Sequence, residues 1–193
     1  MTPVGLVVGG RETGEVTVMV ALLRGINVGG RGKLPMADLR AIATDLGYDD
    51  VATYIQSGNL VLSSRESAAS VARDLAKAIA AAGHVSPAVM IRTRTQLAKL
   101  VRDNPFLTRG EDAGLQHVLF TEGPAKAALA GLDLRSYAPE EAIAVGHELY
   151  LFLPNGVGRS KLAVDVGRQK VVGTMRSWRT VTTVLAMADE AAG

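Results

Sequence analysis

The residues best placed to do chemistry lie in a basic, glycine-rich stretch that follows an early apolar run. The stretch from Arg24 to Leu34 contains three basic residues and no acidic one. Its glycines let backbone N–H groups turn toward a shared centre, and the helix expected next adds free N–H groups at its start. We therefore predict a pocket for a carboxylate or phosphate group. The predicted contacts in this first loop are Arg24, Gly25, Asn27, Gly29, Gly30 and Lys33.

Two standard phosphate-binding motifs do not match this first loop. A P-loop ends in Gly-Lys followed by serine or threonine, whereas Gly32-Lys33 is followed by Leu34. The dinucleotide-binding pattern G-x-G-x-x-G is also absent from the sequence. A second interpretation therefore stays open, in which the loop is a glycine-rich connection between a strand and a helix, with solvated basic groups.

A second loop, residues 155–161, is also rich in glycine and basic residues and also precedes an expected helix. Between Arg159 and Arg179 the chain has six basic residues and one acidic residue, Asp165. If the two loops face each other, Ser160, Lys161 and Arg176 would complete one positive pocket, with Trp178 as a stacking platform. The alternatives are that Ser160 only caps a helix and that Trp178 only packs in the core.

The segment Gln56-Ser57-Gly58-Asn59 forms the tip of an expected hairpin. Turn chemistry accounts for the serine, glycine and asparagine. Gln56 is less well explained by the turn, and we include Gln56 and Asn59 among the predicted ligand contacts.

The sequence predicts no metal site and no cofactor. Its three histidines, His84, His117 and His147, are far apart and lack metal-binding spacing, and there is no cysteine. The nucleophile elbow G-x-S-x-G does not occur either. No reaction can therefore be assigned from motifs, and whether the protein is an enzyme stays open.

Composition narrows the range of partners. The chain of 193 residues is 48% hydrophobic and 21% charged, which indicates a folded protein. Its net charge of +2 and sparse aromatic residues (4%) argue against a dedicated nucleic-acid binder. The longest early apolar run, Val16 to Leu23, is too short to span a bilayer, so we expect a cytoplasmic protein with no membrane partner.

Hydrophobic periodicity predicts an α+β protein of two ferredoxin-like subdomains, each with the order β-α-β-β-α-β (an alpha-beta plait). The alternative is one larger mixed sheet. No residue-level repeat links the halves. We expect residues 1–15 to be a disordered extension, with Met19 an alternative start to Met1. The other expected units are subdomain 1 (16–93), a helix and linker (94–115), subdomain 2 (116–176) and a C-terminal helix (177–193).

A family resemblance rests on six segments: ALLRGINVGG (21–30), MADLR (36–40), TYIQSGN (53–59), NPF (104–106), LYLFLPNGVGRSKL (149–162) and TMRSW (174–178). These segments resemble the DUF1697 family of uncharacterised bacterial proteins. The resemblance implies two ferredoxin-like subdomains and no activity, because none is established for the family. Ser177 departs from the asparagine of the family pattern T-x-R-N-W, and the extension before Met19 is atypical.

Three functions follow as hypotheses. The leading one is binding of a small ligand that carries a phosphate or carboxylate group, at the first loop. The second is a non-catalytic interaction module that forms a homodimer. The third is weak, nonspecific contact with nucleic-acid backbones.

Overall fold

The computed structural model describes residues 15–28 and 33–193, and its framework is a pair of separate antiparallel sheets. The expectation of an α+β protein is confirmed, and the alternative of one larger mixed sheet is not what the described residues form. The predicted extension, residues 1–15, lies outside these residues except for Glu15. The first sheet has the strand order β2-β3-β1-β4, with β1 (Thr17–Leu23), β2 (Asp49–Tyr54), β3 (Asn59–Ser64) and β4 (Val89–Thr93).

The second sheet repeats this order as β6-β7-β5-β8. Its strands are β5 (Gln116–Thr121), β6 (Glu141–Val145), β7 (Glu148–Phe152) and β8 (Gly173–Ser177). The alanine-rich sequence after Pro124 predicts a short helix to about Gly131, but the structure has a 3-10 segment there, Ala125–Leu129. This run is too short to nucleate an α-helix well, and its two fully buried residues, Ala125 and Ala128, follow the three-residue period of a 3-10 turn.

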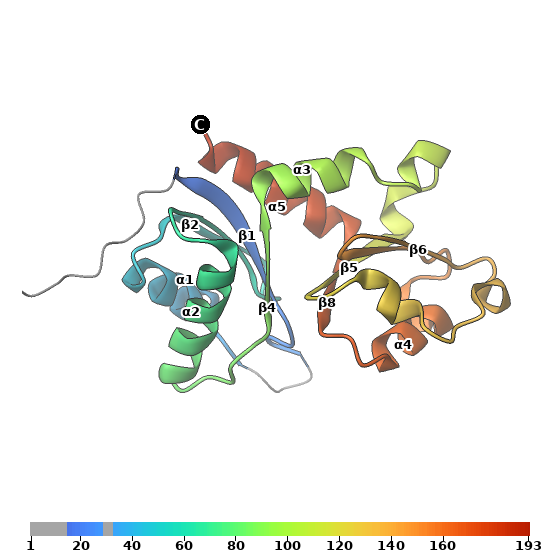
Figure 1. Cartoon of the computed structure of the whole chain (residues 1–193), viewed down its shortest axis with the longest axis horizontal. Helices are drawn as coiled ribbons and strands as arrows, with labels where there is room; N and C mark the ends of the chain where they lie inside the picture. Colours follow the sequence, from blue (N-terminus) through green and yellow to red (C-terminus); the bar gives the residue numbers. More distant parts are fainter. Residues whose placement is uncertain (1–14, 29–32) are drawn as a thin grey trace, which may run out of the picture.

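The described residues contain five α-helices, which form layers with the sheets (Figure 1). Helices α1 (Met36–Asp45) and α2 (Ala68–Ala81) cover the outer face of the first sheet, and α4 (Lys161–Arg168) covers the outer face of the second. Helices α3 (Arg94–Arg102) and α5 (Trp178–Ala191) pack against each other and against the inner faces of the sheets. The connection between β4 and β5 thus lies beside the C-terminal helix.

Strand β1 is apolar from Val18 to Leu23, and it is buried on both faces from Met19 onward. Met19, Ala21 and Leu23 face α1 and α2, whereas Val20 and Leu22 face a central core that both halves share. Val118 and Phe120 of β5 enter the same central core from the other sheet. A continuous apolar run is what a strand with two covered faces requires.

Local signals at the helix ends agree in part with the expectations. The sequence from Thr93 to Gln96 predicts a capping box, and it forms at the start of α3. The Thr93 hydroxyl accepts from the N–H of Gln96, and the Gln96 side chain accepts from the N–H of Thr93. From the sequence, Ser64 is predicted to cap the helix that follows it. This is wrong, because Ser64 lies in β3 and Ser67 caps α2 by accepting from the backbone N–H of Ser70. Ser177 ends β8 and caps α5, so the helix expected over 177–193 begins at Trp178.

Candidate functional site

The base of the first loop is closed by the side chain of Asn27. Its Oδ1 accepts from the backbone N–H of Leu34 at 2.9 Å, and its Nδ2 donates to the carbonyl of Leu34 at 2.9 Å. The same Nδ2 donates to the carbonyl of Gln56 at 2.7 Å, which ties the loop to the β2–β3 turn. Asn27 therefore acts as a brace of the loop. Gly29 and Gly30 lie outside the described residues.

The β2–β3 turn lies against the end of β1. A Cβ atom added at Gly58, whose φ is +72°, would lie 2.8 Å from the Cβ of Leu23. Only glycine accommodates both this backbone conformation and this close approach. Gln56 is exposed at the tip of the turn, beside the loop that Asn27 braces.

Arg24 and Lys33 supply the positive charge of the first loop. Both are exposed, and no acidic side chain among residues 15–28 and 33–193 forms an ion pair with either. Gly25, between Arg24 and the buried Ile26, is exposed as well. The described part of the loop thus presents two cationic groups to solvent.

Arg176 of β8 reaches across to the first sheet and is 8% exposed. Its Nε donates to Oδ1 of Asn59 at 2.6 Å, and its Nη2 donates to the carbonyls of Leu23 (2.8 Å) and Ser57 (2.9 Å). Its Nη1 donates to Oγ1 of Thr174 at 2.6 Å and to a carbonyl of its own strand. Burial lowers the pKa of Arg176 to about 10, so it remains a cation at neutral pH. We call this set of contacts the Arg176 clamp.

The start of α4 already holds a carboxylate from the chain itself. Ser160 caps the helix by accepting from the N–H of Ala163 at 2.8 Å, and its hydroxyl donates to Oε2 of Glu140 at 3.0 Å. The N–H of Leu162 donates to the same Oε2 at 3.0 Å. Glu140, 6% exposed, therefore occupies the position where a helix N-terminus would hold an anion.

The structure brings together some of the predicted residues and separates others. Asn27, Gln56, Asn59 and Arg176 come together through the bonds above, whereas no described residue of the first loop hydrogen-bonds to Ser160 or to the exposed Lys161. Trp178, 5% exposed, packs in the central core.

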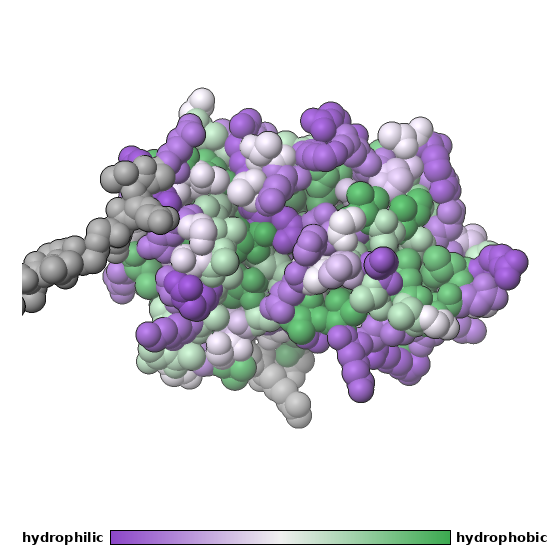
Figure 2. Space-filling model, in the orientation of Figure 1, coloured by the Kyte–Doolittle hydropathy of each residue, from purple (hydrophilic) through white to green (hydrophobic). Residues whose placement is uncertain are grey.

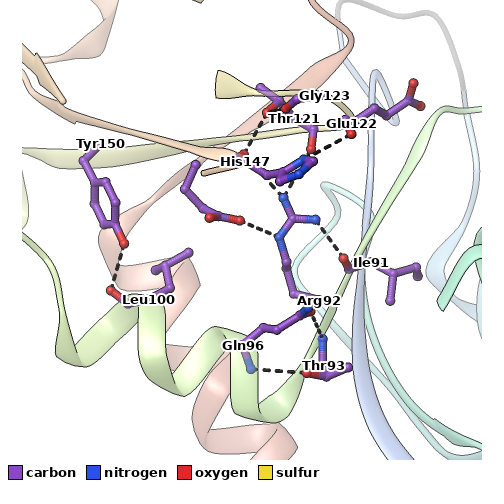
Figure 3. Close-up of polar contacts among 11 residues, drawn as sticks. Ile91, Arg92, Thr93, Gln96, Leu100, Thr121, Glu122, Gly123, His147 and Tyr150 are labelled. Atoms are coloured by element: carbon purple, nitrogen blue, oxygen red, sulfur yellow. Dashed lines mark hydrogen bonds and ion pairs between the residues drawn. The ribbon is translucent and has the colours of Figure 1, made fainter. Parts of the chain in front are cut away.

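Sequence reasoning missed a cleft between the two sheets, on the side of β4. It has a volume of about 640 Å³, within the usual range for small-molecule sites. Strand β4, helix α3 and the start of α2 form one side, and the end of β5 with the β6–β7 turn forms the other. Figure 3 shows Arg92 extending from β4 toward the turn that carries His147.

Arg92 forms the second clamp between the sheets. Its Nε donates to Oε1 of Glu148 at 2.5 Å, and its Nη2 lies 3.2 Å from the carbonyl of Thr121 and 3.4 Å from that of His147 (Figure 3). Its guanidinium carbon lies 5.6 Å from the ring centre of Phe120. We call this set the Arg92 clamp. No motif marked it, because its partners lie far away along the chain.

Tyr150 lines the same cleft. Its hydroxyl donates to the carbonyl of Leu100 at 3.1 Å, and burial raises its pKa well above the ordinary value. The tyrosine therefore stays neutral and ties β7 to α3. Within the described part of the chain, no three histidine, aspartate or glutamate side chains gather as metal ligands, and no helix is long and apolar enough to cross a bilayer.

Comparisons with known proteins give a family and a fold. A model of the family described as "Protein of unknown function (DUF1697)" matches residues 16–150. The structure is similar to that of a conserved bacterial protein from Streptococcus pneumoniae, with a TM-score of 0.68 and 22% identity over 90% of this chain and 99% of the other. At this identity the likeness concerns the fold alone. Among curated proteins, none matches the chain.

Proposed function

This chain belongs to the DUF1697 family, whose function is unknown, and we propose from its own geometry that it binds a small anionic ligand at the first loop. The observation that carries the proposal is the pair of exposed cations, Arg24 and Lys33, without an acidic partner among the described residues. Asn27 braces the loop between them. A braced loop with free cations loses little conformational entropy when it binds a phosphate or carboxylate.

The Arg176 clamp also supports this proposal, because it adds positive charge next to the first loop. It places a buried cation at the end of β1, and none of the groups that it bonds to among the described residues is a carboxylate. Its donors are occupied by neutral oxygens, so its effect on a ligand is through charge at a distance. Gly25, Gly29, Gly30, Gln56 and Asn59 remain predicted contacts. Ser160, Lys161 and Trp178 are left out of the proposed pocket because no described contact joins them to the first loop.

The double variant Arg24→Ala with Lys33→Ala tests the proposal. Inorganic phosphate and a panel of phosphorylated metabolites are added to both proteins, and the midpoint of thermal unfolding is measured. A phosphate compound present at 100 times its Kd stabilises the wild type by about 2.7 kcal/mol, and the double variant should lose this stabilisation.

The matched control removes two exposed basic residues from the second loop, Arg159→Ala with Lys161→Ala. It carries the same change in net charge and should keep the stabilisation. If phosphate compounds stabilise the Arg24/Lys33 variant as much as the wild type, the first loop is not the site. If only the control loses the effect, the site is at the second loop.

We also infer that each half is a ferredoxin-like subdomain, with boundaries at 16–93 and 116–176. The support is the shared strand order and antiparallel pairing, with 3-10 turns replacing the first helix of the second half. An experimental structure with a different strand order in either half would contradict this inference. A cytoplasmic location remains a prediction.

The other two hypotheses have less support. Exposed large apolar residues occur singly, for example Val28, Val85 and Val164, and Figure 2 shows hydrophobic and hydrophilic residues interspersed on one face. A homodimer therefore has no specific observation in its favour. Base stacking on a sheet needs an exposed aromatic face, whereas buried residues from both sheets fill the central core.

A further inference from the structure

The Arg92 clamp and the Arg176 clamp occupy equivalent positions in the two halves. Arg92 stands opposite Val20 of β1, and Arg176 stands opposite Val118 of β5. Each guanidinium donates to a carbonyl at the end of the other half's central strand, three residues beyond the valine of that other half: Arg92 to Thr121, beyond Val118, and Arg176 to Leu23, beyond Val20. Each half therefore binds the other through an arginine that donates to the end of the partner half's central strand.

The clamps differ in the side chain that accepts from Nε. Asn59, the first residue of β3, accepts from Arg176, and Glu148, the first residue of β7, accepts from Arg92. The register confirms the equivalence, because Asn59 pairs with Leu22 and Glu148 pairs with Phe120. The acceptor is thus a neutral amide in the Arg176 clamp and a carboxylate in the Arg92 clamp. The Arg92 clamp is therefore less positive than the Arg176 clamp by one charge.

The cleft beside the Arg92 clamp has open hydrogen-bond acceptors. Glu148 uses Oε1 for Arg92, and its Oε2 has no hydrogen bond to any residue that the structure describes. Nδ1 of His147 lies 3.2 Å from the carbonyl of Glu122, so in the neutral ring Nδ1 carries the proton and Nε2 is an acceptor. The exposed carboxylate of Glu122 lines the cleft as well and has no ion pair among the described residues.

The rest of the cleft offers few free charges and an apolar wall. The ammonium group of Lys99 is engaged with Asp103, and the Arg92 guanidinium is engaged in its clamp. Accessible apolar surface comes from three exposed or half-buried residues, Ala69, Ala72 and Val145. A ligand that matches this lining has several N–H donors, a positive charge and an apolar body.

We propose that the cleft between the sheets binds a small organic cation, an amine or amidine with an apolar body. Its cationic head donates to Oε2 of Glu148 and Nε2 of His147, and its body lies on Ala72 and Val145. None of these residues belongs to the anion site proposed at the first loop, so this inference goes beyond that function and stands or falls separately.

Benzylamine and benzoate test the proposal, because they share a shape and differ in charge. Each is titrated into the full chain, and the backbone amide shifts are followed by NMR. Benzylamine should shift the amides around His147 and Gln96, and benzoate should not. In Glu148→Gln, which keeps an oxygen for Arg92 as Asn59 does for Arg176, the Kd for benzylamine should rise about tenfold.

Two further variants keep the test decisive. Glu190→Gln removes an exposed carboxylate outside the cleft lining and should leave the Kd for benzylamine unchanged. Ala69→Leu narrows the cleft at an exposed helical position and should weaken binding even if Glu148→Gln folds poorly. Equal binding of benzoate, an unchanged Kd in both cleft variants, or shifts that map away from the cleft would each overturn the proposal.

Discussion

Arg176 carries its charge into the boundary between the two sheets and is surrounded there by neutral oxygens. Moving a cation out of water is costly, and hydrogen bonds from every nitrogen of the guanidinium offset that cost. Arginine suits this position because its planar fork of five N–H donors reaches acceptors from several segments at once. Lysine, with three donors at one point, could not serve β1, the β2–β3 turn and β8 together.

Replacing Arg176 with methionine should therefore destabilise the protein. The apolar side chain fills part of the space but leaves the carbonyls of Leu23 and Ser57 and the amide of Asn59 without their donor. We expect a loss of about 3 kcal/mol in the free energy of unfolding, measured by urea denaturation. The neighbouring Arg179→Met, at an exposed position, should cost less than about 0.5 kcal/mol. Equal effects of the two changes would show that the clamp contributes nothing specific.

At the scale of elements, the N-terminus of α4 shows how a loop that resembles an anion site can be satisfied internally. The carboxylate of Glu140 precedes β6 in sequence, yet it accepts from the hydroxyl of Ser160 and from the N–H of Leu162 at the start of the helix. A negative charge at this end of a helix is favourable because the free N–H groups point toward it. The second glycine loop therefore leads into a helix N-terminus that is already capped by Ser160 and Glu140.

Ser160→Ala and Glu140→Gln should each destabilise the fold by about 1 kcal/mol. Because the two side chains share one hydrogen bond, the double variant should lose less than the sum, with a coupling of at least about 0.5 kcal/mol. Chemical denaturation of the four proteins measures this cycle. Lys161→Ala, at the exposed first position of the helix, is the control and should change stability by less than about 0.5 kcal/mol. Strict additivity would contradict the shared cap.

At the scale of the whole molecule, the two halves are joined by a common core as well as by the two clamps. Val20 and Leu22 from the first sheet, Val118 and Phe120 from the second, and Trp178 from α5 belong to one buried cluster. If the halves separated, part of this cluster would become exposed on each inner face. Apolar surface that is buried only in the joint structure makes the stability of each half depend on the other.

The protein should accordingly unfold in a single cooperative transition. Trp178 is the one tryptophan in the chain and lies in the shared core, so its fluorescence reports on contact between the halves. We expect the fluorescence transition in urea to coincide with the loss of far-UV circular dichroism. A fluorescence change at clearly lower urea than the loss of secondary structure would mean that the halves separate before they unfold.

The sequence by itself determined the features that depend on near neighbours along the chain. The apolar run of β1, the capping box of Thr93 and Gln96, and the helix cap at Ser160 were all predictable, because each rests on residue types a few positions apart. The boundary between β1 and the first loop was predictable for the same reason. The role of Asn27 was not, since its partner at residue 56 lies 29 positions away.

Only the tertiary structure decided what the charged residues do. Arg176 was predicted to contact a ligand, and its guanidinium bonds to a carbonyl 153 positions away, a contact that the sequence did not indicate. Arg92 and Glu148 belong to no motif, yet they line the wall of a cleft. A guanidinium binds any suitably placed oxygen, so residue type alone does not select its partner. The packing of two sheets on one shared core brings those oxygens within reach, and that packing is the sum of many distant contacts.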